Sequence, residues 1–213
     1  MKSKKDVKEI IKILKETYPE AECSLDFSNP FQMAIAVLLS AQCTDAMVNI
    51  VTKELFKIAP NAKEMNKLTV EEIEKYISSC GLYKTKAKNI KGLAEMVMDT
   101  YNGEIPDTME ELVKLPGIGR KSANVVMLEA FHNPQGVAID THAKRICNRI
   151  GISKEESPEK IEQDLLKKID KDEYFDANHL CVWHGRYTCK ARKPECERCT
   201  ITKYCNYFKI KNK

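Results

Sequence analysis

Apolar residues recur at helical intervals along most of the chain. Near the N-terminus, Val7, Ile10, Ile11 and Leu14 follow the i, i+3, i+4, i+7 pattern of an amphipathic helix. Comparable patterns cover residues 45–58, 69–77, 90–101, 120–128, 141–150, 158–169 and 173–186. No segment shows the alternation of apolar and polar residues that is typical of a strand. We therefore predict an all-α fold with about ten helices.

Capping residues mark the start of several of these helices. Asn29 followed by Pro30 is typical of an N-cap with proline in the first turn. The next stretch, FQMAIAVLLSAQ, is apolar on all sides and is predicted to be the central buried helix. Asp45 is predicted to cap the following helix, and capping-box patterns begin at Thr69 and Asp107.

The segment 115–126, LPGIGRKSANVV, combines a tight turn with the start of a helix. Gly117 and Gly119 permit a sharp turn and close approach of another backbone. The amide groups at such a turn can bind a phosphate. Lys121 falls in the first helical turn beside Arg120, where the positive end of the helix dipole favours a neutral amine. A simple surface turn with solvated Arg120 and Lys121 is the alternative interpretation.

Four of the nine cysteines, Cys189, Cys196, Cys199 and Cys205, form a C-x6-C-x2-C-x5-C pattern near the C-terminus. Four thiolates this close together can hold a [4Fe–4S] cluster or a structural zinc ion. Zinc sites usually contain two close cysteine pairs, and only one is present here, so the spacing favours the cluster. Two disulfides are the third alternative, which an intracellular chain disfavours. With all positions filled by protein, such a centre is structural or transfers electrons.

Charge and hydropathy narrow the range of partners and locations. The net charge is +4, and from Arg186 onward there are nine Lys/Arg and two Asp/Glu. A basic segment suits a polyanionic partner, although a solvated tail has the same composition. The N-terminus lacks the apolar core of a signal peptide, and the apolar stretch Met33–Leu39 is too short to span a membrane. We therefore expect a cytoplasmic protein without a targeting segment.

Several motifs, taken in order, resemble the endonuclease III group of helix-hairpin-helix base-excision DNA glycosylases. They are LLSAQCTD (38–45), GLYKTKAKNI (81–90), LPGIGRKSANVV (115–126), VAIDTH (137–142), HGRYTC (184–189) and the four-cysteine loop. The resemblance implies a two-lobed all-α fold with a helical bundle over 25–133, including a helix-hairpin-helix at about 107–131. The second lobe would comprise 1–24 and 134–213 and carry a [4Fe–4S] cluster on the four cysteines.

The resemblance also implies an activity. Lys121 would be the nucleophile of a bifunctional glycosylase and abasic-site lyase, and Asp140 would be its catalytic carboxylate, besides capping the helix that follows it. The substrate would be duplex DNA with oxidised or ring-damaged pyrimidines or abasic sites. The enzyme would be a monomer of prokaryotic type, associated with the nucleoid.

Six further residues are implied to contact DNA: Gln42, Leu82, Gly117, Gly119, Arg120 and His142. Gln42 and Leu82 would enter the duplex where the target base is flipped out. Read without the resemblance, Gln42 is a polar residue at a helix end, Leu82 is a core leucine and His142 forms a structural hydrogen bond.

Two other functions fit parts of the pattern. The first is a monofunctional glycosylase for mismatched adenine or thymine, which lacks the hairpin lysine. The second is a non-catalytic DNA-binding protein with an iron–sulfur cluster. The presence of both Lys121 and Asp140 disfavours these alternatives.

Overall fold

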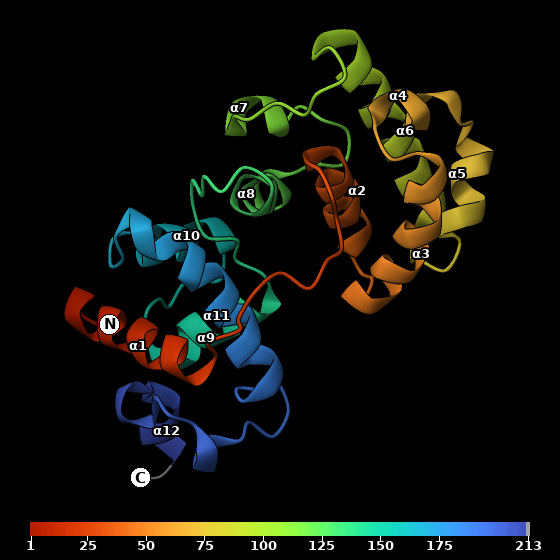
Figure 1. Ribbon diagram of the computed structural model, residues 1–213. Coiled ribbons are helices and arrows are strands. Elements are labelled where there is room, and N and C mark those ends of the chain that lie inside the picture. The colour runs from red at the N-terminus through yellow and green to blue at the C-terminus, as the bar shows by residue number, and fades with distance from the viewer. Residues whose placement is uncertain (212–213) are drawn as a thin grey trace. The chain divides into compact units, whose positions relative to one another are not determined.

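The structure is a computed structural model that describes residues 1–211. Within that range it contains α-helices and short 3₁₀ helices and no strand (Figure 1), which confirms the predicted all-α fold. The chain forms two compact units, one of Ser24–Asn133 and one that joins Met1–Cys23 to the chain from Pro134 onward. The assignment of 25–133 and 1–24 plus 134–213 as separate domains stays a prediction.

The unit Ser24–Asn133 contains seven helices. They are α2 (Pro30–Ser40), α3 (Asp45–Ile58), α4 (Ala62–Lys67), α5 (Val70–Ile77), α6 (Tyr83–Thr100), α7 (Met109–Leu112) and α8 (Arg120–Glu129).

The other unit contains five α-helices and three 3₁₀ helices within its described residues. They are α1 (Lys4–Thr17), α9 (Thr141–Ile150), α10 (Pro158–Leu166), η1 (Lys171–Glu173), α11 (Tyr174–Tyr187), η2 (Cys196–Arg198), η3 (Thr202–Tyr204) and α12 (Asn206–Lys211).

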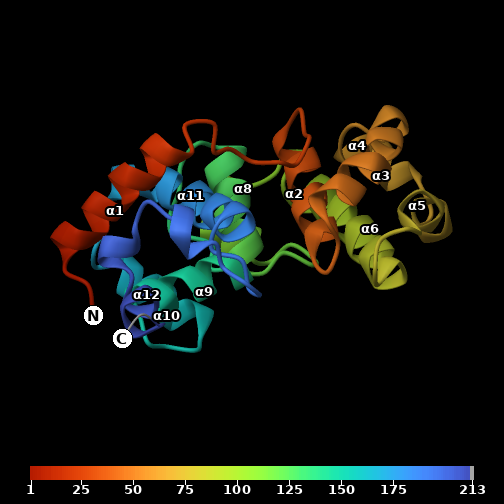
Figure 2. The same ribbon diagram turned by 90° about the horizontal axis from the view of Figure 1, so that it is seen from below.

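Helix α2 is the centre of its unit, as predicted. Residues 31–39 are all buried, and α2 packs against α3, α6 and α8. Figure 2 shows α2 running beside α3 and α6. Asn29 accepts the amide N–H of Gln32 at 3.0 Å and so caps the helix. The helix ends at Ser40, which leaves Ala41 and Gln42 in the loop that leads to α3.

Two predicted caps are wrong by one residue. Thr44, and not Asp45, caps α3 by accepting the amide of Met47, while Asp45 is the first helical residue. Likewise Thr108, and not Asp107, caps the single-turn helix α7. The capping box at Thr69 is present as predicted.

The core of the second unit forms around α1, α9, α10 and α11. The apolar stripe of α1 is buried as predicted and packs against α11. Isoleucines of α9 and α10 complete this core, together with the thiols of Cys147 and Cys181. Within residues 1–211, no helix is both long and apolar enough to cross a membrane.

Candidate functional site

The glycine turn before α8 is built as the sequence predicts. Gly117 has a φ of +79°, and a Cβ there would lie 2.7 Å from Cδ1 of Leu38 on the central helix. Glycine is therefore required both for the backbone conformation and for the close packing. Gly119 is the N-cap of α8, and its carbonyl accepts the amide of Ala123 at 2.9 Å.

Lys121 occupies the second position of α8, and its side chain is exposed to solvent next to the exposed Arg120. The amide groups of a first helical turn lack acceptors within the helix and carry the positive end of its dipole. The turn therefore presents an accessible primary amine beside backbone donors that suit a phosphate.

Asp140 is the N-cap of α9 in the other unit. Its Oδ1 accepts the amide of Ala143 at 2.7 Å, so the predicted capping role is observed. The loop before it is clamped by the buried Asn178 of α11, which donates to the carbonyl of Gly136 at 3.1 Å and accepts the amide of Ala138 at 2.8 Å. The backbone that carries the carboxylate is thus held from both sides.

The segments of Gln42 and Leu82 meet in the unit Ser24–Asn133. Both residues have left-handed backbones, with φ of 54° and 59°. A Cβ on Gly81 would lie 3.3 Å from the carbonyl oxygen of Gln42, so the two backbones are in direct apposition. Leu82 is 61% exposed, so its interpretation as a core leucine is wrong.

A buried lysine that the sequence pattern did not single out supports this loop. Nζ of Lys86, on α6, donates to the carbonyls of Leu39 at 2.9 Å and Ala41 at 2.6 Å. These carbonyls lie at the C-terminal end of α2, where a cation is favoured by the helix dipole. Lys86 therefore fixes the start of the loop that carries Gln42.

His142 makes the structural hydrogen bond given above as its alternative role. Its Nδ1 accepts from Nη2 of Arg145 at 3.1 Å, and it packs so closely on Gly185 that a Cβ there would lie 2.7 Å from the histidine side chain. Arg145 also donates to the carbonyl of Gly185 at 2.9 Å, which joins α9 to α11. Contact of His142 with DNA stays a prediction.

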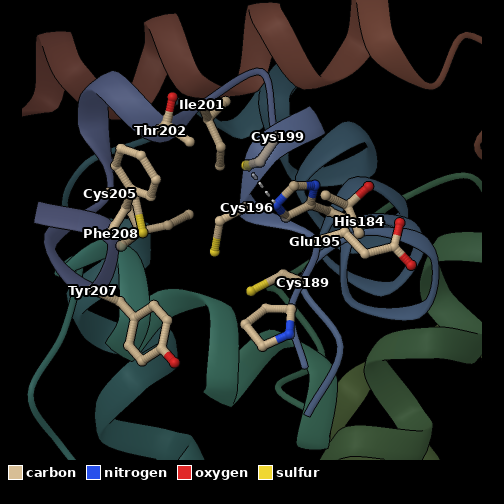
Figure 3. A pocket seen from close by; sticks show the side chains of 13 residues that line it. His184, Cys189, Glu195, Cys196, Cys199, Ile201, Thr202, Cys205, Tyr207 and Phe208 are labelled. Atoms are coloured by element: carbon tan, nitrogen blue, oxygen red, sulfur yellow. Dashed lines mark hydrogen bonds between the residues drawn. The ribbon is translucent and has the colours of Figure 1, made fainter. Parts of the chain in front are cut away.

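The four cysteines predicted as ligands line one pocket. In Figure 3 their sulfur atoms point into a common space. Apolar side chains, among them Ile150 and Ile201, complete the lining. None of the four cysteines forms a disulfide bond. Four convergent thiols with an apolar surround fit an iron–sulfur cluster.

Arg149 of α9 attaches the beginning of this loop. Its Nη1 lies 3.4 Å from Sγ of Cys189 and donates to the carbonyl of Lys190 at 2.8 Å, and its Nη2 donates to that of Ala191 at 3.0 Å. The guanidinium carbon lies 4.8 Å from the centroid of the Tyr207 ring. The only sequence signal for this role is the i, i+4 spacing of Arg145 and Arg149.

His184 lines the same pocket as the four cysteines. Its Nε2 is 3.8 Å from Sγ of Cys199, and its Nδ1 is 3.1 Å from the hydroxyl of Tyr18. Burial, aided by the nearby charge of Arg145, lowers the pKa of His184 to about 4. The ring is therefore neutral at physiological pH and offers one N–H donor.

Comparisons with known proteins agree with this arrangement. Residues 35–171 match the HhH-GPD superfamily of base excision DNA repair proteins, and residues 189–205 match the iron-sulfur binding domain of endonuclease III. The endonuclease III of Synechocystis sp. is 45% identical over 206 residues, covering 96% of this chain and 94% of its own length. The endonuclease III of Bacillus subtilis is 44% identical over 191 residues, which cover 89% of this chain and 87% of its own length.

A solved endonuclease III, trapped as a covalent intermediate with DNA, is 42% identical and matches with a TM-score of 0.94 over 100% of both chains. The predicted family and the predicted [4Fe–4S] cluster are confirmed. This chain belongs to the endonuclease III family of the HhH-GPD superfamily of base excision DNA repair proteins.

Proposed function

We propose that this chain is a bifunctional DNA glycosylase and abasic-site lyase that acts at the nucleoid on oxidised or ring-damaged pyrimidines. Its membership of the endonuclease III family supports the activity, and the bacterial relatives support the cellular setting. The observation that carries the residue assignment is the exposed Lys121 in the first turn of α8, directly after the glycine turn.

Lys121 is the proposed nucleophile. Its Nζ attacks the anomeric carbon of the sugar as the bond to the damaged base breaks, and the product is a protonated Schiff base. The iminium acidifies the neighbouring sugar carbon, and loss of that proton expels the 3′ phosphate. The helix N-terminus and the backbone amides of the glycine turn favour binding of a phosphate near the lesion. This assignment uses one lysine for both activities.

Asp140 is the proposed catalytic carboxylate. Departure of the base leaves positive charge on the sugar, which a preorganised anion stabilises. The clamp of Asn178 on the preceding loop and the capping bond to α9 hold this carboxylate in a fixed orientation. Fixed charges stabilise a transition state more effectively than mobile ones, because no reorganisation is needed during the reaction.

Gln42 and Leu82 are the proposed residues that enter the duplex. The exposed, apolar Leu82 can act as a wedge between base pairs, and the amide of Gln42 can hydrogen-bond the base left without a partner. The proximity of their backbones supports this joint role. When the cluster is bound to its four cysteines, it ties the segments of the C-terminal loop together and has a structural or electron-transfer role.

Borohydride trapping tests the proposal. The protein is mixed with a duplex containing an oxidised pyrimidine or an abasic site, and borohydride then reduces any Schiff base to a stable cross-link. We expect wild-type protein to cross-link and Lys121→Ala to form no cross-link, because the attacking amine is lost. The cross-linked species is measured by its shift on a denaturing gel.

Lys75→Ala is the matched control, since Lys75 is an exposed lysine on α5 of the same unit. It should cross-link like the wild type. Absence of cross-linking by wild-type protein on both duplexes would overturn the lyase assignment and favour a monofunctional glycosylase or a non-catalytic DNA-binding protein.

A further inference from the structure

Two cysteines outside the cluster lie side by side. Sγ of Cys43 is 3.5 Å from Sγ of Cys80, although the residues are 37 positions apart in the sequence. Cys43 is half-buried and reachable from solvent, whereas Cys80 is only 2% exposed. Neither is a cluster ligand in the site described above, so their juxtaposition has no role in the proposed mechanism.

The position of this pair connects it to DNA binding. Cys43 directly follows Gln42, and Cys80 precedes Leu82 by two residues. Gly81, which lies between Cys80 and Leu82 in the sequence, is so close to Gln42 that a Cβ on it would lie 3.3 Å from the carbonyl oxygen of Gln42. Any change in the distance between the two sulfurs therefore acts on the two segments proposed to enter the duplex.

We propose that Cys43 and Cys80 are a redox-active dithiol that a low-molecular-weight disulfide converts to a reversible disulfide, displacing the two segments and weakening DNA binding. The effect on DNA rests on the proposed function of Gln42 and Leu82. Formation of the bond itself does not depend on that function.

The conversion is a thiol–disulfide exchange in two steps. Cys43, after loss of its proton, attacks one sulfur of the small disulfide; a mixed disulfide forms and one small thiolate leaves. Cys80, also after loss of its proton, then attacks Sγ of Cys43, and the second small thiolate leaves. Two electrons pass from the protein thiols to the small disulfide, which is reduced to two thiols.

The two thiols differ in exposure to solvent, and this difference determines which of them attacks first. Burial and the adjacent Cys43 raise the pKa of Cys80 to about 11, so little of it is thiolate at neutral pH. The more exposed Cys43 therefore reacts first. Cys80 reacts second, where its fixed position beside the target sulfur offsets its low thiolate fraction.

Bond formation must move the backbone or the side chains. The sulfurs have to approach from 3.5 Å to about 2.0 Å, the length of a disulfide bond. Gln42 and Leu82 flank the pair and hold left-handed backbones, with φ of 54° and 59°. Such conformations persist only while the surrounding structure holds them, so these two residues absorb the movement.

A second cysteine pair provides an internal comparison. Cys147 and Cys181 lie in the core of the other unit, where Cys147 is 0% exposed and Cys181 is 9% exposed. The adjacent Cys147 side chain raises the pKa of the Cys181 thiol, so these two residues are neighbours as well. Because this pair is shielded from a small disulfide, it should remain reduced while Cys43 and Cys80 become linked.

Peptide mapping tests the modification. The cluster-containing protein is incubated with oxidised glutathione, remaining thiols are alkylated, and the protein is digested without reduction. We expect a linked pair of peptides containing Cys43 and Cys80, which dithiothreitol separates, and alkylated Cys147 and Cys181. Glutathione retained on Cys43 without a link to Cys80, or both thiols found alkylated, overturns the proposal.

Binding to a duplex with an abasic-site analogue tests the consequence. We expect oxidation to weaken binding by wild-type protein by about tenfold or more and dithiothreitol to restore it, whereas Cys43→Ala, which lacks the attacking thiol, does not respond to glutathione. The visible absorbance of the cluster is followed throughout, so that samples with damaged clusters are discarded. Equal affinity of linked and reduced protein overturns the effect on DNA.

Borohydride trapping of the fully reduced wild type separates this inference from the proposed function. Failure to trap would count against the function and leave the mapped disulfide standing. Normal trapping without a Cys43–Cys80 link would count against the disulfide alone.

Discussion

At the scale of single residues, Asp140 illustrates how one side chain serves both the fold and the chemistry. Its Oδ1 accepts the amide of Ala143 at 2.7 Å, which caps α9. The capping bond occupies one of the two carboxylate oxygens, so capping does not prevent the side chain from stabilising positive charge on a sugar. The two roles can be separated because asparagine caps helices about as well as aspartate and carries no charge.

We therefore expect Asp140→Asn to keep the fold and lose the activity. Its free energy of unfolding should change by less than about 0.5 kcal/mol, since the cap is retained. Base release should slow by about 10²–10³, the usual effect of removing one preorganised electrostatic contact. Single-turnover excision on a duplex with an oxidised pyrimidine and a thermal unfolding curve measure the two quantities.

Asp140→Ala provides the contrast, because it removes the cap as well as the charge. It should lose about 1 kcal/mol of stability in addition to the activity. Excision by Asp140→Asn at the wild-type rate would restrict Asp140 to a capping role.

At the scale of elements, helix α9 links the proposed catalytic carboxylate to the cluster loop. Asp140 caps the helix, and Arg145 and Arg149 follow one turn apart and contact the loop. Arg145 donates to the carbonyl of Cys189 at 2.9 Å, while Arg149 holds the sulfur of the same cysteine and the two carbonyls after it. Two arginines of α9 thus connect the cluster loop to the helix that Asp140 caps.

Arg149→Met should loosen the cluster without unfolding the chain. Methionine keeps much of the packing on Tyr207 but loses three hydrogen bonds to the first part of the loop. We expect purified protein to lose its visible cluster absorbance several-fold faster in the presence of a chelator, since loops with fewer contacts open more often. Iron content per chain checks the initial loading.

Arg192→Met is the control, because it makes the same charge change at an exposed position of the same loop. Its cluster should decay at the wild-type rate. Equal decay of the two variants would assign the effect to lost charge and not to the contacts of Arg149.

Helical periodicity predicted the buried face of α1 correctly, because burial repeats with the helical turn, and the continuous apolar stretch of α2 correctly predicted a helix that is buried on all sides. The caps of α3 and α7 were predicted one residue away, because threonine and aspartate are adjacent in both places and both can cap. The backbone conformation, which the pattern does not contain, decides between them.

Contacts between distant segments escaped prediction for a related reason. The four cysteines are close in sequence, so their spacing alone indicated a common centre. By contrast, the bond of Asn178 to Ala138 joins residues 40 positions apart, and Cys43 lies beside Cys80 across 37 positions. Such pairs depend on how helices pack, and a single sequence carries no periodic signal for that.

At the scale of the whole molecule, charge is separated along the chain. The segment from Arg186 onward contains nine Lys/Arg and two Asp/Glu within a chain whose net charge is only +4. Two of these cations, Lys190 and Arg198, form ion pairs with Glu195. Arg192 and Lys193 are exposed on the loop between the first two cluster cysteines, and we expect them to contact DNA phosphates.

The combined variant Arg192→Ala/Lys193→Ala tests this expectation through the salt dependence of binding. Each phosphate contact contributes about 0.9 to the slope of log K against log salt concentration, so losing two should reduce the slope by nearly 2. Affinity should fall equally for damaged and undamaged duplexes, because phosphate contacts carry no sequence information. The variant Lys5→Ala/Lys12→Ala makes the same charge change on exposed positions of α1. If the slope of log K against log salt concentration falls equally in this control variant, the effect is due to net charge. If the control keeps the wild-type slope, the phosphate contacts lie in the cluster loop.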